Sequence, residues 1–235
     1  MARLRPWSED VWFAEAPLRF FGMPLGTRMT VVRLADGDLL VHSPVELDPD
    51  LLREIASLGP VLHVVSPNKL HHLYLGGARE AFPDARFYAP PGLSRKRPDL
   101  RFDAELADPG VRFTGLEHAL VRGSRWMEEV VFFHPPSRTL LVGDLCEHFG
   151  PECPVWMRLL MRLARMYERP RMPPDWQLSF RDREATHASF ERILAWDFDR
   201  ILLAHGAPVV RGARKPFLRE YAWALGGSPR TDGIE

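Results

Sequence analysis

Length, composition and charge limit the class of protein. The chain has 235 residues, 46% of them hydrophobic and 26% charged, which is enough apolar sequence for a substantial core in one domain. Its 31 basic residues equal its 31 acidic residues. No net charge therefore draws the chain to nucleic acid or to an anionic membrane, although this balance permits local patches. We expect no nucleic-acid partner and no membrane partner, and a small molecule as the substrate if the chain is an enzyme.

No segment has the pattern of a secretory signal or of a membrane span. The arginines near the N-terminus are not followed by an apolar run, and no stretch reaches the roughly 18 apolar residues that a span requires. The nearest candidate, VWMRLLMRLARMY, is interrupted by Arg158, Arg162 and Arg165. The two cysteines, Cys146 and Cys153, do not indicate a secreted disulfide framework, and two buried thiols are favoured over a bridge or a metal ligand. We predict a cytoplasmic protein.

The first half of the chain alternates between strand-like and helix-like segments. Asp36-Gly37 predicts the turn of a hairpin, because glycine readily supplies the positive φ that a tight turn needs. Asp48 is expected to cap the next helix and Gly59 to stop it. The predicted elements are, in order, a hairpin of residues 30–34 and 38–44, a helix over 47–59, a strand over 61–67, a helix over 69–82 and a strand over 85–91.

The second half repeats this pattern and contains one longer segment. The predicted elements are strands over 111–116, 128–135 and 139–145, a helix over 154–167, an amphipathic helix over 183–198 and a strand over 199–206. The alternation without a linker predicts a single α/β domain spanning 1–235, with a helical insert around 150–180. The insert would form either a lid over a site or the face of a homodimer. For Trp156 and Trp176 in this insert, core packing is favoured over lining an apolar substrate pocket.

Polar side chains follow three of the predicted strands, where α/β folds display reactive groups. His71 and His72 stand at the start of a predicted helix, from which both can face the end of the strand; the alternative is one packed and one solvent-facing histidine. Asp144 follows an apolar strand and is either a ligand or the cap of a turn. His205 ends the last strand, and Gly206 permits a sharp exit. Alone, each is weak evidence, but together they predict a site for one divalent metal, with zinc, iron and manganese as alternatives.

This order of motifs resembles the metallo-β-lactamase-like hydrolase superfamily, whose pattern is Thr-His-x-His-x-Asp-His, a distant histidine, a Gly-Asp and a late His-Gly. Within it, the segments PNKLHHLYL, SRTLLVGDL and WDFDRILLAHG are similar to the uncharacterised DUF4336 proteins. The resemblance covers the whole chain. It implies a four-layered αββα sandwich of the α/β class and metal-assisted hydrolysis.

The sequence departs from the superfamily pattern at one metal position. In a gapless alignment Ser66 takes the threonine position, while Pro67 and Lys69 take the positions of the first two histidines. The loop ALVRGSRW, where the mid-chain histidine is expected, contains none, and His118 just before it would need a local shift to replace that histidine. The resemblance therefore implies that the first metal position is lost.

The second metal position is kept in the same alignment. His71, His72, Asp144 and His205 occupy the places of its ligands. Lys69 is a further candidate catalytic residue, whose ammonium would replace the first metal and pair with Asp144; the alternative is a solvated lysine.

Two functions of different classes follow from these departures. The first is a hydrolase with at most one metal that activates water against an ester, lactone, thioester or phosphoester, with Asp144 as a ligand or a general base. The second is a binding or scaffold protein of the same fold without a metal.

Overall fold

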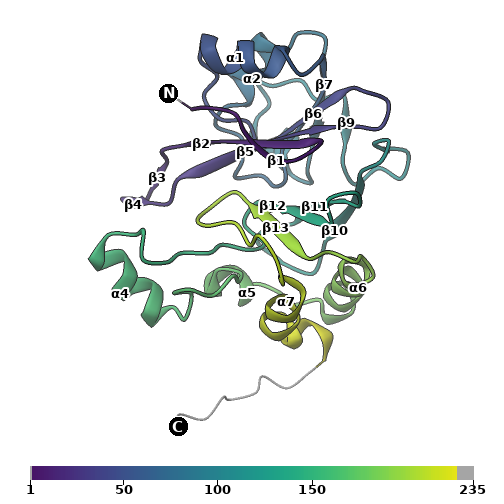
Figure 1. Ribbon diagram of the computed structural model, residues 1–235. Helices are drawn as coiled ribbons and strands as arrows, with labels where there is room; N and C mark the ends of the chain where they lie inside the picture. Colours follow the sequence, from purple (N-terminus) through teal and green to yellow (C-terminus); the bar gives the residue numbers. More distant parts are fainter. Residues whose placement is uncertain (1, 227–235) are drawn as a thin grey trace.

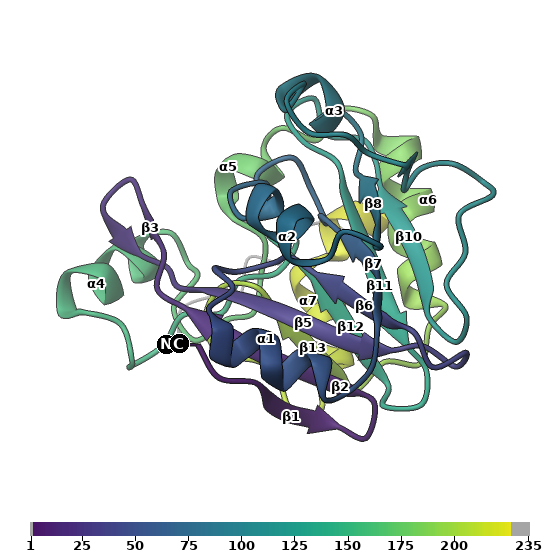
Figure 2. The same ribbon diagram turned by 90° about the horizontal axis from the view of Figure 1, so that it is seen from above.

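The computed structural model describes residues 2–226, in which two β-sheets pack face to face between outer layers of helices (Figure 1, Figure 2). This is the four-layered α/β arrangement that the family resemblance implies. A two-stranded hairpin projects beside the sheets and consists of β3 (Arg19–Phe20) and β4 (Met23–Pro24). Within these residues, no helix combines the length and the apolar character needed to cross a membrane.

The first sheet comes from the N-terminal part of the chain. Its strands, in spatial order, are β1 (Arg5–Ser8), β2 (Val11–Ala16), β5 (Thr27–Arg33), β6 (Leu39–His42), β7 (Val61–Val65), β8 (Arg86–Ala89) and β9 (Ala104–Glu105). Pairing is antiparallel from β1 to β6 and parallel from β6 to β9. Its outer side packs against α1 (Pro49–Ala56), α2 (Leu75–Ala81) and α3 (Leu93–Lys96).

The second sheet comes from the C-terminal part. Its strands are β10 (Glu117–Val121), β11 (Glu129–His134), β12 (Thr139–Val142) and β13 (Arg200–Leu203), and only β12 and β13 are parallel. The helices on its side of the molecule are α4 (Val155–Leu163), α5 (Pro174–Gln177), α6 (Arg183–Leu194), α7 (Arg214–Glu220) and the 3-10 helix η1 (Ala222–Leu225).

Apolar side chains from both sheets form the central layer of the core. Leu40 and Val65 of the first sheet belong to the same buried cluster as Phe132 and Leu202 of the second. Because all four are at most 1% exposed, this layer is fully removed from water and fixes how the two sheets face each other. Cys146 and Cys153 are both buried and free, as the sequence favoured.

Several predicted elements are confirmed by the structure. The hairpin around Gly37 joins β5 to β6, and Gly37 has a φ of +94°. Asp48 caps α1 by accepting hydrogen bonds from the backbone N–H groups of Asp50 at 3.0 Å and Leu51 at 2.9 Å.

Other predicted elements are wrong. The predicted helix over 69–82 begins only at Leu75, so the two histidines lie in a turn. Residues 111–116 make an isolated bridge, between Phe113 and Leu116, in place of a strand. The exposed Trp156 does not pack in the core, whereas Trp176 does.

The topology brings the ends of four strands together at one edge. Parallel pairing aligns the carboxyl ends of β6 with β7 and of β12 with β13. The segments after these strands begin at Ser43, Ser66, Gly143 and Ala204. The start of β5 lies at the same edge, because β5 runs antiparallel to β6.

The sharp exit expected at Gly206 is present, and its backbone explains why glycine stands there. Gly206 has a φ of +89°, and an added Cβ would lie 2.0 Å from the carbonyl oxygen of His148. We expect Gly206→Ala to lower the free energy of unfolding by about 3 kcal/mol or more, measured by denaturant titration. Gly212→Ala is the matched control, since it has a φ of +68° but open space around it, and it should cost only about 1–2 kcal/mol. Equal losses in the two variants would contradict this geometry.

Candidate metal centre

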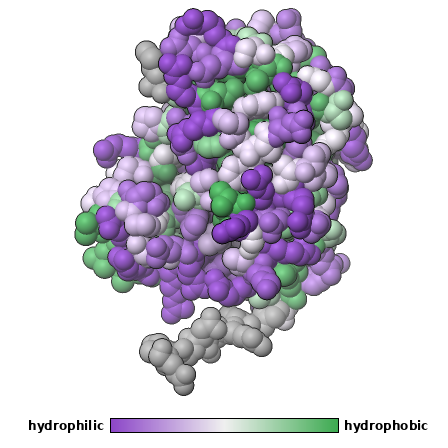
Figure 3. Space-filling model, in the orientation of Figure 1, coloured by the Kyte–Doolittle hydropathy of each residue, from purple (hydrophilic) through white to green (hydrophobic). Residues whose placement is uncertain are grey.

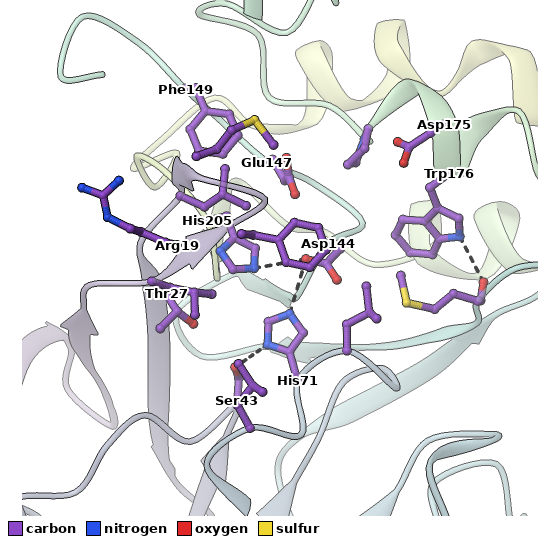
Figure 4. A pocket seen from close by; sticks show the side chains of 18 of the residues that line it. Arg19, Thr27, Ser43, His71, Asp144, Glu147, Phe149, Asp175, Trp176 and His205 are labelled. Carbon is purple, nitrogen blue, oxygen red and sulfur yellow. Dashed lines mark hydrogen bonds and ion pairs between the residues drawn. The ribbon is translucent and has the colours of Figure 1, made fainter. Parts of the chain in front are cut away.

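Three of the four expected metal ligands converge at the shared edge of the sheets. Nε2 of His205 lies 3.1 Å from Oδ1 of Asp144, and Nε2 of His71 lies 3.4 Å from the same oxygen (Figure 4). One ligand atom from each of the three residues lies within 4.8 Å of the others. Two imidazoles and a carboxylate therefore point at one small volume from three separate strand ends.

His71 is oriented by a serine in a strained conformation. Nδ1 of His71 lies 2.6 Å from Oγ of Ser43, the residue after β6. Ser43 has a φ of +54°, which is uncommon for a residue with a side chain and is tolerated where surrounding contacts hold it. Oγ of Ser66 also donates to the carbonyl oxygen of His71 at 2.9 Å, which fixes the turn. These contacts leave Nε2 of His71 directed at Asp144.

His205 is held from the first sheet. Its Nδ1 donates to the carbonyl oxygen of Gly26 at 2.7 Å, just before β5. The buried guanidinium of Arg28 donates to the carbonyl oxygens of Leu203 and, at 2.9 Å, of Gly206. Arg28 thereby clamps the loop that carries His205 on both sides of the histidine.

The ion pair between His205 and Asp144 changes the pKa of both groups. Burial alone would lower the pKa of His205, but the hydrogen bond with Asp144 and its charge raise it to about 9. Burial alone would raise the pKa of Asp144, but the charge of His71 and the hydrogen bonds from both histidines lower it below its ordinary value. In the absence of a metal, the ion pair with Asp144 therefore favours the doubly protonated form of the His205 ring.

The amide of Asn68 bridges two buried carboxylates beside this cluster. Nδ2 of Asn68 donates to Oδ2 of Asp144 at 2.9 Å and to Oε2 of Glu129 at 2.7 Å. Its Oδ1 accepts from the backbone N–H of Leu70 at 2.8 Å, so the amide orientation is determined. In the alignment, Asn68 lies between Pro67 and Lys69, which replace two ligands of the first metal. A neutral amide donor thus contacts one oxygen of the Asp144 carboxylate.

Glu129 holds the loop that carries Asp144. Its buried carboxylate accepts backbone N–H donors from Gly143 at 2.9 Å, Asp144 at 2.8 Å and Leu145 at 3.1 Å, besides the amide of Asn68. Burial and the charge of Asp144 raise the pKa of Glu129 to about 7. All four partners are donors, and they stabilise the ionised form.

Removing the carboxylate of Glu129 should be costly for the fold. We expect Glu129→Ala to lower the free energy of unfolding by about 3–5 kcal/mol, because three backbone N–H groups lose their buried acceptor. Denaturant titration checks this, with the partly exposed neighbour Glu128 as the matched control. Glu128→Ala should cost less than about 1 kcal/mol; a similar loss for both variants would show that Glu129 is not the anchor.

His72 and Lys69 do not join the cluster, contrary to the sequence-based expectation. Nδ1 of His72 lies 3.2 Å from Nη1 of Arg97, which also donates to the carbonyl oxygen of His72 at 2.9 Å. Burial and the cations Lys96 and Arg97 lower the pKa of His72. The ammonium of Lys69 donates to the carbonyl oxygen of Trp126 and makes no pair with Asp144 within residues 2–226. The predicted arrangement fails because residues 69–74 form a turn before α2, and in this turn His71 contacts Asp144 while His72 contacts Arg97.

His118, the remaining candidate, packs away from the cluster. It lies on β10 with its ring 5.7 Å from those of Phe113 and Phe132. It therefore fills the aromatic layer between the sheets and does not supply the missing mid-chain ligand.

The cluster opens into an apolar cavity of about 440 Å³. Leu70, Met127, Phe149 and Trp176 are among its lining residues. The hairpin β3–β4 and helix α4 contribute further apolar side chains to the lining. A cavity of this size and character suits a small organic molecule with a large apolar part.

Glu147 is a buried carboxylate of this cavity that the sequence analysis missed. It is 8% exposed, lines the cavity and lies beside His205 in Figure 4. Among residues 2–226 its carboxylate has no hydrogen-bond or ion-pair partner, and burial together with the charge of Asp144 raises its pKa to about 8. The sequence does contain one indication of its role. Glu147 stands three residues after Asp144, so both residues lie in the segment that follows β12.

The residues present fit a single metal with an open coordination position. Two imidazole nitrogens and one carboxylate oxygen suit zinc, iron or manganese, and three protein ligands leave room for water and substrate. The second nitrogen of each ring is engaged, by Ser43 for His71 and by Gly26 for His205, as is usual for metal-binding histidines. That these residues bind a metal stays a prediction.

Two facing sheets between helices, with this cluster at their shared edge, define a protein of the metallo-β-lactamase fold. A metallo-β-lactamase from Pontibacter korlensis matches with a TM-score of 0.63 and 15% identity, over 97% of this chain and 100% of that chain. The metallo-β-lactamase FIM-1 from Pseudomonas aeruginosa, in a mono-zinc form, matches with a TM-score of 0.60 and 12% identity, over 95% of this chain and 96% of that chain. The Flv1 flavodiiron core from Synechocystis matches with a TM-score of 0.63 and 13% identity, over 96% of this chain and 61% of that chain.

The family resemblance is confirmed more specifically in the N-terminal part. Residues 8–94 match the family model described as Domain of unknown function (DUF4336). No curated protein sequence matches the chain. At such low identities the structural matches show the fold alone.

Proposed function

We propose that this chain is a metal-dependent hydrolase that uses one divalent metal, held by His71, Asp144 and His205. The observation that carries the proposal is the convergence of both histidine Nε2 atoms on Oδ1 of Asp144 at an edge of the apolar cavity. The mono-zinc form of the similar FIM-1 enzyme is a precedent for one metal on this fold.

The protein residues have separate roles in this proposal. His205 would give up the proton on Nε2 to hold the metal, while Gly26 keeps its Nδ1 in place. When bound, a divalent metal there would polarise the substrate oxygen and lower the pKa of water toward ~7. Glu147, which lines the cavity and has no side-chain partner among residues 2–226, would orient the attacking water and accept its proton.

The lining of the cavity favours a substrate with an apolar part. Most of its side chains are apolar, and its charged groups have both signs, with Asp144, Glu147 and Asp175 beside Arg19 and Lys96. Among the substrate classes that the resemblance implies, those with a large apolar part therefore fit best, and a carboxylic ester of this kind is a suitable probe.

Hydrolysis of a series of p-nitrophenyl esters with increasing acyl length tests the proposal. The zinc-loaded wild type should hydrolyse them, and rates should rise with acyl length until the cavity is filled. His205→Ala should lose this activity. His72→Ala should keep metal-dependent hydrolysis, because His72 lines the cavity but its Nδ1 faces Arg97 instead of Asp144. Equal rates for wild type and His205→Ala would overturn the proposal.

The hydrogen bonding of the cluster supports a second candidate function. His71, His205 and Asn68 already surround the carboxylate of Asp144, so the cluster can be stable without a metal. In that case the cavity would bind an apolar molecule without changing it. A chain that takes up no metal but binds the ester series without hydrolysis would favour this function.

A further inference from the structure

An exposed apolar surface lies beside the cavity and shares Phe20 and Leu160 with its lining, and we call it the mouth face. It is formed by the hairpin β3–β4 and by α4, which project at the same end of the molecule in both ribbon views (Figure 1, Figure 2). Its exposed side chains are Phe20, Phe21, Val155, Trp156, Leu159, Leu160 and Leu163. Apolar colour also gathers over α4 in the space-filling view (Figure 3). Contiguous exposed apolar residues of this kind usually mark an interaction site.

Helix α4 has two apolar sides, and the protein covers only one of them. Met157 and Met161 are buried and pack with Phe149, Cys153 and Met166. At 100° per residue, the exposed side chains of α4 fall on a different side of the helix from these two methionines. Leu163 is 76% exposed, although a helix of a globular protein normally turns its apolar residues to the core.

The hairpin and α4 form one unit with the cavity. Met23 of the hairpin packs against the buried methionine cluster of α4. Phe20 and Leu160 are exposed on the mouth face and also line the cavity. At the tip of the hairpin, Phe21 is 90% exposed and has a φ of +46°. Phe20 and Leu160 therefore connect the exposed apolar side chains of the mouth face to the lining of the cavity.

The charge on the mouth face has one sign. Arg19 lies on the hairpin, Arg158 and Arg162 lie on α4, and Arg165 lies two residues after the end of α4. Residues 17–26 and 154–165 contain no acidic residue, and the nearest ones in the chain are Glu15, Glu152 and Glu168. Within the described part of the chain, none of the four arginines forms an ion pair. The mouth face thus combines exposed apolar groups with unpaired cations.

We propose that the mouth face docks on an anionic lipid surface. Apolar side chains beside unpaired arginines match the boundary between acyl chains and anionic headgroups. A second copy of the chain is less suitable, because a two-fold contact would bring the arginines of both copies together without carboxylates to pair with them. With nine residues, α4 is suited to lie in the interface. The balanced net charge of the chain is compatible with such a local patch.

Docking would deliver substrate to the cavity. The ester of the proposed function would then be one whose apolar part resides in lipid, since Phe20 and Leu160 connect the mouth face to the cavity. This consequence rests on the proposed function, whereas docking itself does not.

Vesicle flotation with the chelator-treated 235-residue chain tests docking independently of metal and hydrolysis. We expect binding to phosphatidylcholine vesicles that contain phosphatidylglycerol, weaker binding at high salt, and little binding to phosphatidylcholine alone. Phe21→Ser combined with Leu163→Ser should weaken binding roughly tenfold for each residue. Val210→Ser, at a residue 56% exposed outside the mouth face, is the matched control and should bind as the wild type does.

Three outcomes would overturn the proposal. The first is no binding of the wild type to anionic vesicles, and the second is equal binding of the wild type and the double variant. The third is a dimer in sedimentation experiments without vesicles that the double variant abolishes, which would assign the mouth face to a second copy. Circular dichroism of each variant ensures that a loss of binding does not reflect unfolding.

Discussion

Replacing His205 with alanine is expected to lower the affinity of the protein for a divalent metal by more than about 100-fold. Loss of a group that only orients a ligand already costs about 10–100-fold in metal proteins, and His205 is placed as a ligand itself. Its Nε2 is 3.1 Å from Oδ1 of Asp144, and its Nδ1 is fixed by Gly26. Equilibrium dialysis against zinc, with the metal measured by elemental analysis, gives the affinity.

His72→Ala is the matched control for this experiment. The sequence pattern assigns both histidines to one metal, whereas the structure turns His72 toward Arg97. We expect this variant to bind metal as tightly as the wild type does. If His72→Ala lost the metal and His205→Ala kept it, the ligand set proposed from the geometry would be wrong.

Replacing Glu147 with glutamine is expected to lower kcat for ester hydrolysis by about 10²–10⁴-fold while metal is retained. The amide preserves the shape of the side chain but cannot accept the proton of the attacking water. The carboxylate is buried, lines the cavity and has no protein partner within residues 2–226. Steady-state kinetics of the zinc-loaded variant, with metal content measured on the same sample, check this.

Asp175→Asn controls for the loss of a cavity carboxylate. Asp175 also lines the cavity, but Figure 4 shows it near Trp176 and away from the histidines. We expect its kcat to stay close to that of the wild type. Loss of metal in Glu147→Gln would instead make Glu147 a fourth ligand, and unchanged kcat would remove it from the reaction.

Local sequence patterns allowed the α/β class and the place of the candidate site to be predicted, whereas the four-layered arrangement was implied by the family resemblance. Apolar strands that end in a polar residue are visible as a local pattern, and strands that run in parallel bring their carboxyl ends together. Asp144 and His205 each follow such a strand and lie side by side in the structure. His71 was predicted for the same reason and lies with them.

The finer geometry of the site depends on contacts that the sequence pattern does not contain. Which of His71 and His72 faces Asp144 depends on the turn before α2. The hydrophobic periodicity of this segment predicted a helix there, so the choice could not be made from the sequence. The amide of Asn68 could not be distinguished from the ammonium of Lys69 as the partner of Asp144, because the two residues are adjacent. Glu129 and Glu147 were not predicted as site residues, because the sequence does not reveal that their carboxylates are buried in the folded protein.

The metal content of each chain tests the central proposal most directly. Protein treated with a chelator is titrated with zinc, and bound metal is counted per chain by elemental analysis. We predict one equivalent, lost in His205→Ala, because Pro67 and Lys69 take the positions of two first-metal histidines in the alignment and the amide of Asn68 already contacts Asp144. Two equivalents in the wild type, or none, would contradict the single-metal site.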